Sequence, residues 1–144
     1  MEDNANAVEP DAGGTNLEAV REKFKADRFA SVCAGAVIDS VSGDSAVCSF
    51  EIGPNHLNAG GNVMGGAIFT LADFAFAVAS NNRGGLVVSI ENSIQFIGSS
   101  KGSKLIATAI PDKVGRSMVF YTVKVEDDLG KLIAKVSVVG KRVS

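Results

Sequence analysis

Tryptophan is absent from this sequence, and histidine and cysteine are scarce: the 144 residues include one histidine and two cysteines. One histidine and two separated thiols cannot form the clustered ligand set of a zinc or iron site, so we expect no metal. Two cysteines also exclude the disulfide framework of a small secreted domain. Cys33 and Cys48 would not face each other in a hairpin that turns at Ser42 and Gly43, which favours free thiols in a reducing cytoplasm.

Charge of one sign is also scarce, since 14 basic residues stand against 16 acidic ones. Four of the acidic residues and none of the basic ones lie in the first sixteen positions, so residues 17–144 carry a small basic excess. That excess is too small for the footprint of a nucleic-acid-binding protein. It is compatible with a ligand that bears phosphate groups.

The first 14 residues are rich in asparagine, alanine, glycine and acidic residues and have no periodicity. They predict a disordered acidic tail over 1–14, followed by a single domain over 15–144. An acidic start without an apolar core also argues against a signal peptide. The nearly all-apolar run 63–80 is long enough to suggest a membrane span, but Asp73, its glycines and the lack of basic flanks favour a buried core helix, so no membrane partner is expected.

Hydrophobic periodicity divides the first half of this domain into a helix and a hairpin. A capping box at 15–18, followed by apolar residues at helical spacing, predicts an amphipathic helix to about residue 29. From residue 32 the period changes to two, and residues 33–42 and 44–53 are typical of a β-hairpin.

The second half has a central helix and four strands. A loop at 54–62 precedes the apolar helix, which we expect over 63–81. The first of the following strands would place Leu86, Val88, Ile90, Ile94 and Phe96 on one face. Long alternating strands around one apolar helix predict an α+β fold in which an antiparallel sheet curls about that helix. The four strands are expected over 86–97, 104–112, 117–126 and 131–142.

The segment from His56 to Asp73 holds most of the functional information. It begins as a polar, glycine-bearing loop and continues as a very apolar helix with one carboxylate inside it. A buried carboxylate is costly and therefore invites a functional explanation. The helix start offers free N–H groups at its positive end, made closely approachable by Gly65 and Gly66. Acyl-transfer chemistry needs these two elements, an oxyanion site and a base or nucleophile.

This segment resembles the signature of the hotdog-fold acyl-CoA thioesterases of the phenylacetyl-CoA thioesterase type, within the 4-hydroxybenzoyl-CoA thioesterase superfamily. The one departure is Met64, which stands where that family has a histidine. The resemblance covers roughly residues 17–144 and implies hydrolysis of an acyl-CoA to a free acid and coenzyme A. It implies no cofactor beyond the coenzyme A of the substrate, and homodimers that pair into homotetramers. The matching residues are His56, Asn58, Gly61, Gly65, Gly66 and Asp73.

Helix geometry separates the two principal candidates. Gly65 and Asp73 would stand about 12 Å apart along the helix and about 80° apart around it. One thioester carbon cannot meet both groups. If both act on one substrate, they come from different subunits, which predicts an active site at a homodimer interface.

Gly65 is our candidate for the oxyanion donor through its backbone N–H, and Gly66 for a neighbouring contact with the substrate. The alternative is that the glycine pair only permits close packing. Asp73 would be the nucleophile or the base that activates water; alternatively it is structural and bonds a backbone group across the dimer. The resemblance implies that Asn58 orients the thioester or the water, whereas an asparagine in a glycine-rich loop is also a common turn former.

Each of the remaining candidates has a structural or surface interpretation as well as a functional one. His56 falls at a motif position that would hold the loop, with general-base catalysis as its alternative. Met64 cannot donate a hydrogen bond or carry a proton, so it predicts a slower enzyme or a shifted acyl preference. Ser89 matches a serine that helps place the acid or water in some relatives, but it also fits a solvated strand face. Arg116 could grip a coenzyme A phosphate or be a plain surface charge.

Three phenylalanines of the central helix could line an acyl pocket, although most of that surface is expected to be core. Two other functions remain open from the sequence. The first is a non-catalytic acyl-CoA-binding hotdog protein, which the loss of the family histidine keeps possible. The second is a hotdog hydratase or dehydratase, which needs a histidine paired with an acid and loses its obvious candidate at Met64. The three phenylalanines are Phe69, Phe74 and Phe76.

Overall fold

The computed structural model describes residues 16–144, so the acidic tail expected over 1–14 lies outside the described residues. The chain forms two α-helices, a π-helical turn, a short 3₁₀ turn and six strands. In chain order these are α1 (Leu17–Phe24), the π turn (Phe29–Cys33), β1 (Val37–Ser42), β2 (Ser45–Glu51), the 3₁₀ turn (Pro54–His56), α2 (Gly65–Asn81), β3 (Val87–Phe96), β4 (Lys104–Val114), β5 (Met118–Asp127) and β6 (Leu132–Arg142).

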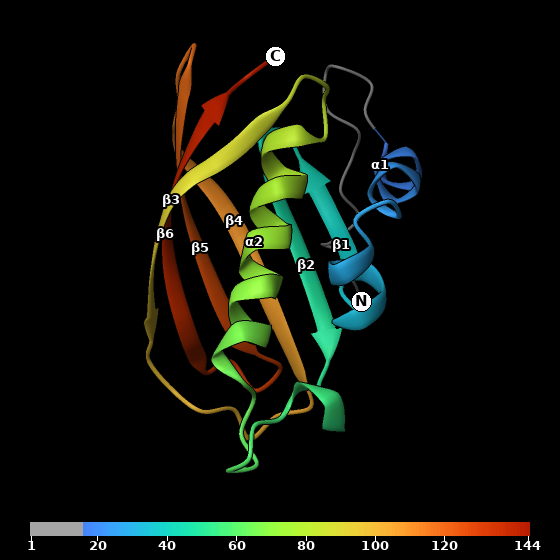
Figure 1. The fold of residues 1–144 in the computed structure, drawn as a ribbon, viewed down its shortest axis with the longest axis vertical. Coiled ribbons are helices and arrows are strands. Elements are labelled where there is room, and N and C mark those ends of the chain that lie inside the picture. The colour runs from blue at the N-terminus through green and yellow to red at the C-terminus, as the bar shows by residue number, and fades with distance from the viewer. Residues whose placement is uncertain (1–15) are drawn as a thin grey trace, which may run out of the picture.

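All six strands belong to one antiparallel sheet in the order β1-β2-β4-β5-β6-β3. The sheet curls around α2, while α1 and the π turn lie outside it beside β1 (Figure 1). This arrangement confirms the α+β fold with a curled sheet about a central helix. It leaves β1 and β3 as the two edges of the sheet.

The core fills the space between α2 and the concave face of the sheet. Leu71, Ala75 and Val78 of α2 are fully buried there. Close approach is required at Gly140 of β6, where a Cβ atom would lie 2.7 Å from Cζ of Phe76. The apolar face that would have suited a membrane is thus covered by protein. Within residues 16–144, no helix combines the length and apolar character that a membrane crossing requires.

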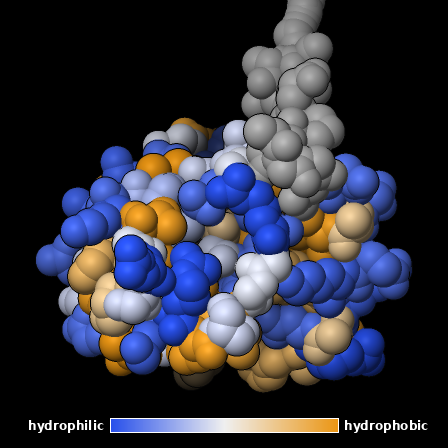
Figure 2. All heavy atoms as spheres, turned by 90° about the horizontal axis from the view of Figure 1, so that it is seen from above, coloured by the Kyte–Doolittle hydropathy of each residue, from blue (hydrophilic) through white to orange (hydrophobic). Residues whose placement is uncertain are grey.

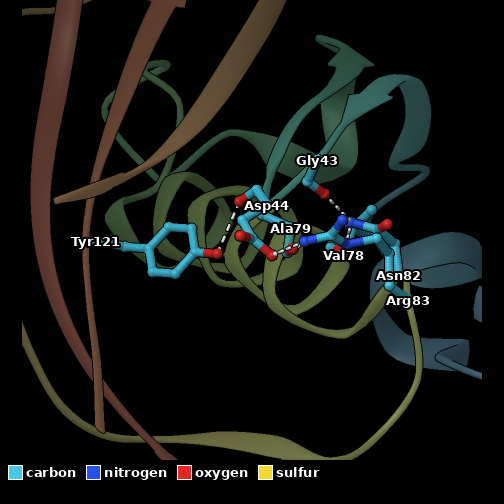
Figure 3. Close-up of polar contacts among 7 residues, drawn as sticks. All are labelled: Gly43, Asp44, Val78, Ala79, Asn82, Arg83 and Tyr121. Atoms are coloured by element: carbon cyan, nitrogen blue, oxygen red, sulfur yellow. Dashed lines mark hydrogen bonds and ion pairs between the residues drawn. The ribbon is translucent and has the colours of Figure 1, made fainter. Parts of the chain in front are cut away.

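Two asparagines tie the end of α2 to the sheet. Asn81 accepts from the N–H of Val87 at 2.8 Å and donates to the carbonyl of the same residue at 3.0 Å. The side-chain amide of Asn81 therefore makes the two hydrogen bonds that a neighbouring strand would make with Val87, the first residue of β3. Asn82 donates to the helix carbonyls of Val78 and Ala79 and to the carbonyl of Gly43 in the β1–β2 turn (Figure 3). Side-chain amides thus provide hydrogen-bond donors for carbonyl groups at the end of α2, and they bind this end of the helix to β3 and to the β1–β2 turn.

The expectation for residues 25–36 was wrong in two respects. The first helix ends at Phe24 rather than near residue 29, and the first strand begins at Val37 rather than at residue 33. A π turn lies between them, closed by a hydrogen bond from the Ala34 N–H to the Phe29 carbonyl. Gly35 then reverses the chain with a φ of +71°, a conformation that glycine adopts without strain.

The face assigned to β3 was also wrong. Ser89 lies opposite Gly140 and Glu91 lies opposite its neighbour Val139, so Ile90 is an extra residue in a β-bulge. The bulge reverses the alternation of the strand. Val88 therefore points away from the core, whereas Phe96 points toward the start of α2.

Candidate active site

His56 holds the loop that leads into α2. Its Nδ1 accepts from the Gly53 N–H at 2.9 Å, and its Nε2 lies 2.7 Å from the Ala34 carbonyl oxygen. Because a carbonyl can only accept, these contacts assign the proton to Nε2 and a neutral ring. The ring also stacks on Phe50 at 3.9 Å. Both nitrogens are engaged with backbone, which agrees with the loop-holding interpretation and leaves no free nitrogen to pair with an acid, as a hydratase would require.

Asn58 shapes the tip of the same loop. Its Oδ1 accepts from the N–H groups of Gly60 at 2.9 Å and Asn62 at 3.1 Å. Its own N–H donates to the Asn62 carbonyl at 2.8 Å, and Gly61 completes the turn with a φ of +82°. The turn-forming role is therefore present. Among residues 16–144 its Nδ2 group has no acceptor, and the side chain is exposed.

The first turn of α2 presents unpaired donors. Met64 is the N-cap residue, and its carbonyl accepts from the N–H groups of Ala67 and Ile68. The N–H groups of Gly65 and Gly66 find no acceptor within residues 16–144. They lie at the positive end of a 17-residue helix, where an anion or an oxyanion is stabilised.

Gly65 has a further reason to be glycine. A Cβ atom there would lie 3.0 Å from Cζ of Phe96 at the end of β3. The ring thus covers one side of the helix start while remaining 55% exposed. Close packing and a free N–H are both present at Gly65, so the two interpretations of the glycine pair are compatible.

A pocket of about 380 Å³ opens beside these donors. Its wall combines the start of α2 with the π turn and the His56 loop. None of its lining residues carries a carboxylate, ammonium or guanidinium group, so it suits an uncharged, largely apolar group. The lining residues are Phe29, Cys33, Ala34, Asn55, His56, Met64, Gly66, Ala67 and Thr70.

Asp73 lies in a neighbouring, smaller pocket of about 190 Å³. It is half-buried, and burial raises the pKa of its carboxyl, with a further increase from the negative charge of Asp27. Phe29 and Thr70 line both pockets and form the wall between them. Within one chain Gly66 at the start of α2 and Asp73 therefore line separate pockets, in agreement with the separation that helix geometry predicts.

The other candidates lie farther from the helix start. Ser89 is half-buried on β3, directly before the bulge. Arg116 is exposed in the β4–β5 turn, two residues after Val114, which lines a pocket with Ser80 and Arg83 at the C-terminal end of α2. Figure 2 shows this end of the molecule, where hydrophilic surface predominates. One chain does not bring these two residues together with Gly65.

Of the three helix phenylalanines, Phe69 and Phe74 line the Asp73 pocket. Phe76 instead packs edge-on against Tyr121 at 5.1 Å and belongs to the part of that surface that is core. Sequence reasoning missed Phe29 and Asp27, which reach the pockets from the π turn and the residues before it. No periodicity marks that segment, so no pattern could have found them.

The described residues contain neither a metal-ligand cluster nor a disulfide. Residues 16–144 contain no group of three or more histidine, cysteine or acidic side chains that could hold a metal ion. Both cysteines are free thiols: Cys33 is exposed in the π turn, and Cys48 is buried on β2 opposite Ile38.

Comparison with known proteins agrees with this geometry. Residues 60–134 match the model of the Thioesterase superfamily. An Archaeoglobus fulgidus protein is 35% identical over 82% of this chain and 77% of its own length. Human acyl-coenzyme A thioesterase 13 is 29% identical over 82% of this chain and 87% of its own.

Solved structures give the same fold. The E. coli PaaI protein of the phenylacetic acid degradation operon superposes with a TM-score of 0.78 and 24% identity, covering 90% of this chain and 97% of that one. A hypothetical thioesterase of Streptococcus pneumoniae, solved with coenzyme A, gives a TM-score of 0.77 at 21% identity, covering 84% of this chain and 97% of that one.

The chain belongs to the thioesterase superfamily and has the hotdog fold of these thioesterases. It is a thioester hydrolase.

Proposed function

We propose that this protein hydrolyses acyl-coenzyme A at a site shared by two subunits. The Gly65 N–H of one subunit binds the thioester oxygen, and Asp73 of the other acts on the carbonyl carbon. One observation carries the proposal: the unpaired donors at the start of α2 border one pocket, which Gly66 lines, whereas the unpaired, half-buried Asp73 two turns along the helix lines another. The human relative is named for acyl-coenzyme A, and the pneumococcal structure contains coenzyme A.

The reaction follows from these groups. The Asp73 carboxylate takes a proton from water as the water oxygen attacks the thioester carbon. The carbonyl electron pair moves to oxygen, where the Gly65 N–H stabilises the charge. When the carbonyl re-forms, the C–S bond breaks and its electron pair leaves on sulfur; the proton held by Asp73 passes to that thiolate. A raised pKa makes Asp73 a better base at neutral pH.

Five further residues have supporting roles in this proposal. The Nδ2 group of Asn58 donates to the thioester or to the attacking water, since its Oδ1 is already used by the loop. Met64 and Gly66 line the uncharged pocket beside the donors and contact the substrate there. Ser89 helps to place the water or Asp73, and Arg116 binds a phosphate of coenzyme A.

The subunit contact is proposed at the free edge of β3. That strand has unpaired backbone groups along one side, and exposed apolar side chains lie along it and beside its ends. An edge of this kind is stabilised by pairing with another chain. A second copy would supply the missing half of each site. The resemblance further predicts that such dimers pair into tetramers. The exposed side chains are Leu86, Val88, Ile90, Phe96 and Ile97.

The first experiment measures free-thiol release from short, medium, long and aromatic acyl-CoAs, with Asp73→Asn as the comparison. Turnover of at least one class, reduced at least a hundredfold in the variant, supports the proposal. Binding of acyl-CoA with no thiol released by either protein would instead favour the non-catalytic alternative. Incorporation of ¹⁸O from labelled water into Asp73 during a single turnover would identify it as a nucleophile.

The shared site has its own test. Asp73→Asn and Gly65→Pro are each expected to be inactive, and the two proteins are mixed, unfolded and refolded together. In a mixed dimer one site carries both substitutions and the other carries neither, so activity returns to about a quarter of wild type. A mixture that stays inactive, although mixed dimers are detected by mass spectrometry, would place both residues in a site of one chain.

A further inference from the structure

The Asp73 pocket contains a second carboxylate. Asp27 lines it from the segment between α1 and the π turn. Its N–H donates to the Phe24 carbonyl and its carbonyl accepts from the Ser31 N–H, both at 3.0 Å. The backbone of Asp27 is thus fixed on both sides, which directs its side chain to the pocket reproducibly.

Neither carboxylate has a partner in the described chain. Within residues 16–144 the side chains of Asp27 and Asp73 accept no hydrogen bond and form no ion pair. Structural aspartates usually cap a turn or pair with a base, as Asp127 does here by accepting from the N–H groups of Leu129 and Lys131. Two carboxylates, the exposed Asp27 and the half-buried Asp73, thus line one pocket of about 190 Å³ without a partner among these residues.

We propose that Asp27 is a positioning residue for the hydrolytic reaction: its negative charge, held across the pocket from Asp73, keeps the Asp73 carboxylate a stronger proton acceptor than a lone carboxylate would be. The inference rests on the proposed function, because it gives Asp73 a proton to take. Asp27 itself touches no reacting atom.

The charges around Asp73 support this role. The other residues that line the pocket come from the π turn and from α2, and all are uncharged: Phe29, Ala30, Phe69, Thr70 and Phe74. The basic residues nearest in sequence do not line it; Lys25 instead pairs with Glu22 at 3.0 Å. The negative charge of Asp27 disfavours a second negative charge on the same pocket and therefore raises the pKa of Asp73. Asp73 is half-buried, whereas Asp27 is exposed.

The sign of the expected pH effect follows directly. Asp73 must be ionised to act, and Asp27 moves its ionisation to higher pH. Asp27→Asn therefore moves the acid limb of the pH profile to lower pH. Above that limb the variant is slower, because a weaker base accepts the proton of water less readily.

The experiment compares kcat/KM from pH 4 to 9 for wild type, Asp27→Asn and Asp27→Glu. Asp27→Asn is expected to shift the acid limb down by roughly half a pH unit and to lower the plateau several-fold. Asp27→Glu keeps the charge and restores most of both. Glu126→Gln makes the same change of charge on the outward face of β5 and should reproduce the wild-type profile. An unmoved acid limb in Asp27→Asn, with wild type active, would overturn this inference alone.

A second readout needs no turnover. The carboxyl ¹³C resonance of Asp73 is titrated by NMR in the full-length protein, with and without Asp27→Asn. A lower midpoint in the variant supports the coupling even if no acyl-CoA on the panel is hydrolysed, whereas equal midpoints overturn it. Failure of the proposed function and failure of this inference are thus distinguishable.

Discussion

The N–H of Met64 donates to the carbonyl oxygen of His56 at 2.8 Å. The only histidine of the chain therefore fixes the residue that caps α2, while its ring is held by Gly53 and Ala34. The two residues position the helix start as one unit. Replacing the family histidine by Met64 leaves this unit intact, because the contact uses backbone atoms.

His56→Phe is expected to lower the free energy of unfolding by about 2–4 kcal/mol, since the stack on Phe50 is kept but two backbone groups lose their partners. Urea unfolding measures it. Thr122→Val, which removes an exposed hydrogen bond to Asp112, serves as the control and should cost well under half as much. A variant with unchanged stability and abolished turnover would indicate a catalytic role for His56.

Gly65→Pro is expected to lower kcat by about 10²–10³-fold, because it removes the proposed oxyanion donor. Proline is accepted at the first helical position, and the extended ψ of 140° at Met64 suits a residue that precedes proline. Gly65→Ala is the matched control: it keeps the N–H but presses a methyl group against the Phe96 ring. Equal losses of kcat in the two variants would show that packing, not the N–H, matters at this position.

Asp73→Asn is expected to raise the melting temperature at pH 7 while abolishing turnover. A carboxyl whose folded pKa lies above its unfolded value destabilises the fold wherever the unfolded chain would ionise it. The advantage of the variant should therefore shrink as pH falls through the folded pKa and vanish below the unfolded one. Calorimetry at pH 7, 5 and 3 tests this order. A variant less stable than wild type at pH 7 would point to a structural hydrogen bond from Asp73.

Val88→Lys is expected to yield folded monomers without activity, because it places a charge on the proposed subunit contact. Light scattering after size-exclusion chromatography gives the mass, and circular dichroism checks the fold. Leu129→Lys is the control: Leu129 is 69% exposed in the β5–β6 turn, and its replacement should change neither mass nor turnover. If Val88→Lys keeps the wild-type mass, the contact lies elsewhere.

The sequence predicted the helices and strands in which apolar residues recur at a regular spacing. α2 and the strands from β4 to β6 lie within a few residues of their expected ranges, because burial on one side imposes helical or alternating spacing. The motif also placed Gly65 at a helix start with an unpaired N–H. Two features without a repeating pattern were missed. The π turn is closed by a local hydrogen bond that no residue pattern marks, and the bulge at Ile90 depends on pairing with the distant strand β6.

The candidate site likewise has features that regular spacing predicts and features that it does not predict. Spacing alone separated Gly65 from Asp73, since helix geometry is regular. The contacts that bear on the alternatives at His56 and Asn58 are hydrogen bonds to Ala34 and Asn62, which only the folded loop reveals. The sequence did not predict that Asp27 lies beside Asp73, because the two residues are 46 positions apart and belong to no common motif.

The amide of Asn81 has a consequence for the chain that follows it. Because this one side chain takes both backbone groups of Val87, α2 and β3 are joined without help from the connection between them. Gly84 and Gly85 in that connection both have positive φ, and a Cβ at Gly84 would meet no atom within 4 Å. The connection is therefore not needed to hold α2 against β3. We expect it to accept an inserted peptide tag or fluorescent domain while the helix and the strand keep their relative position.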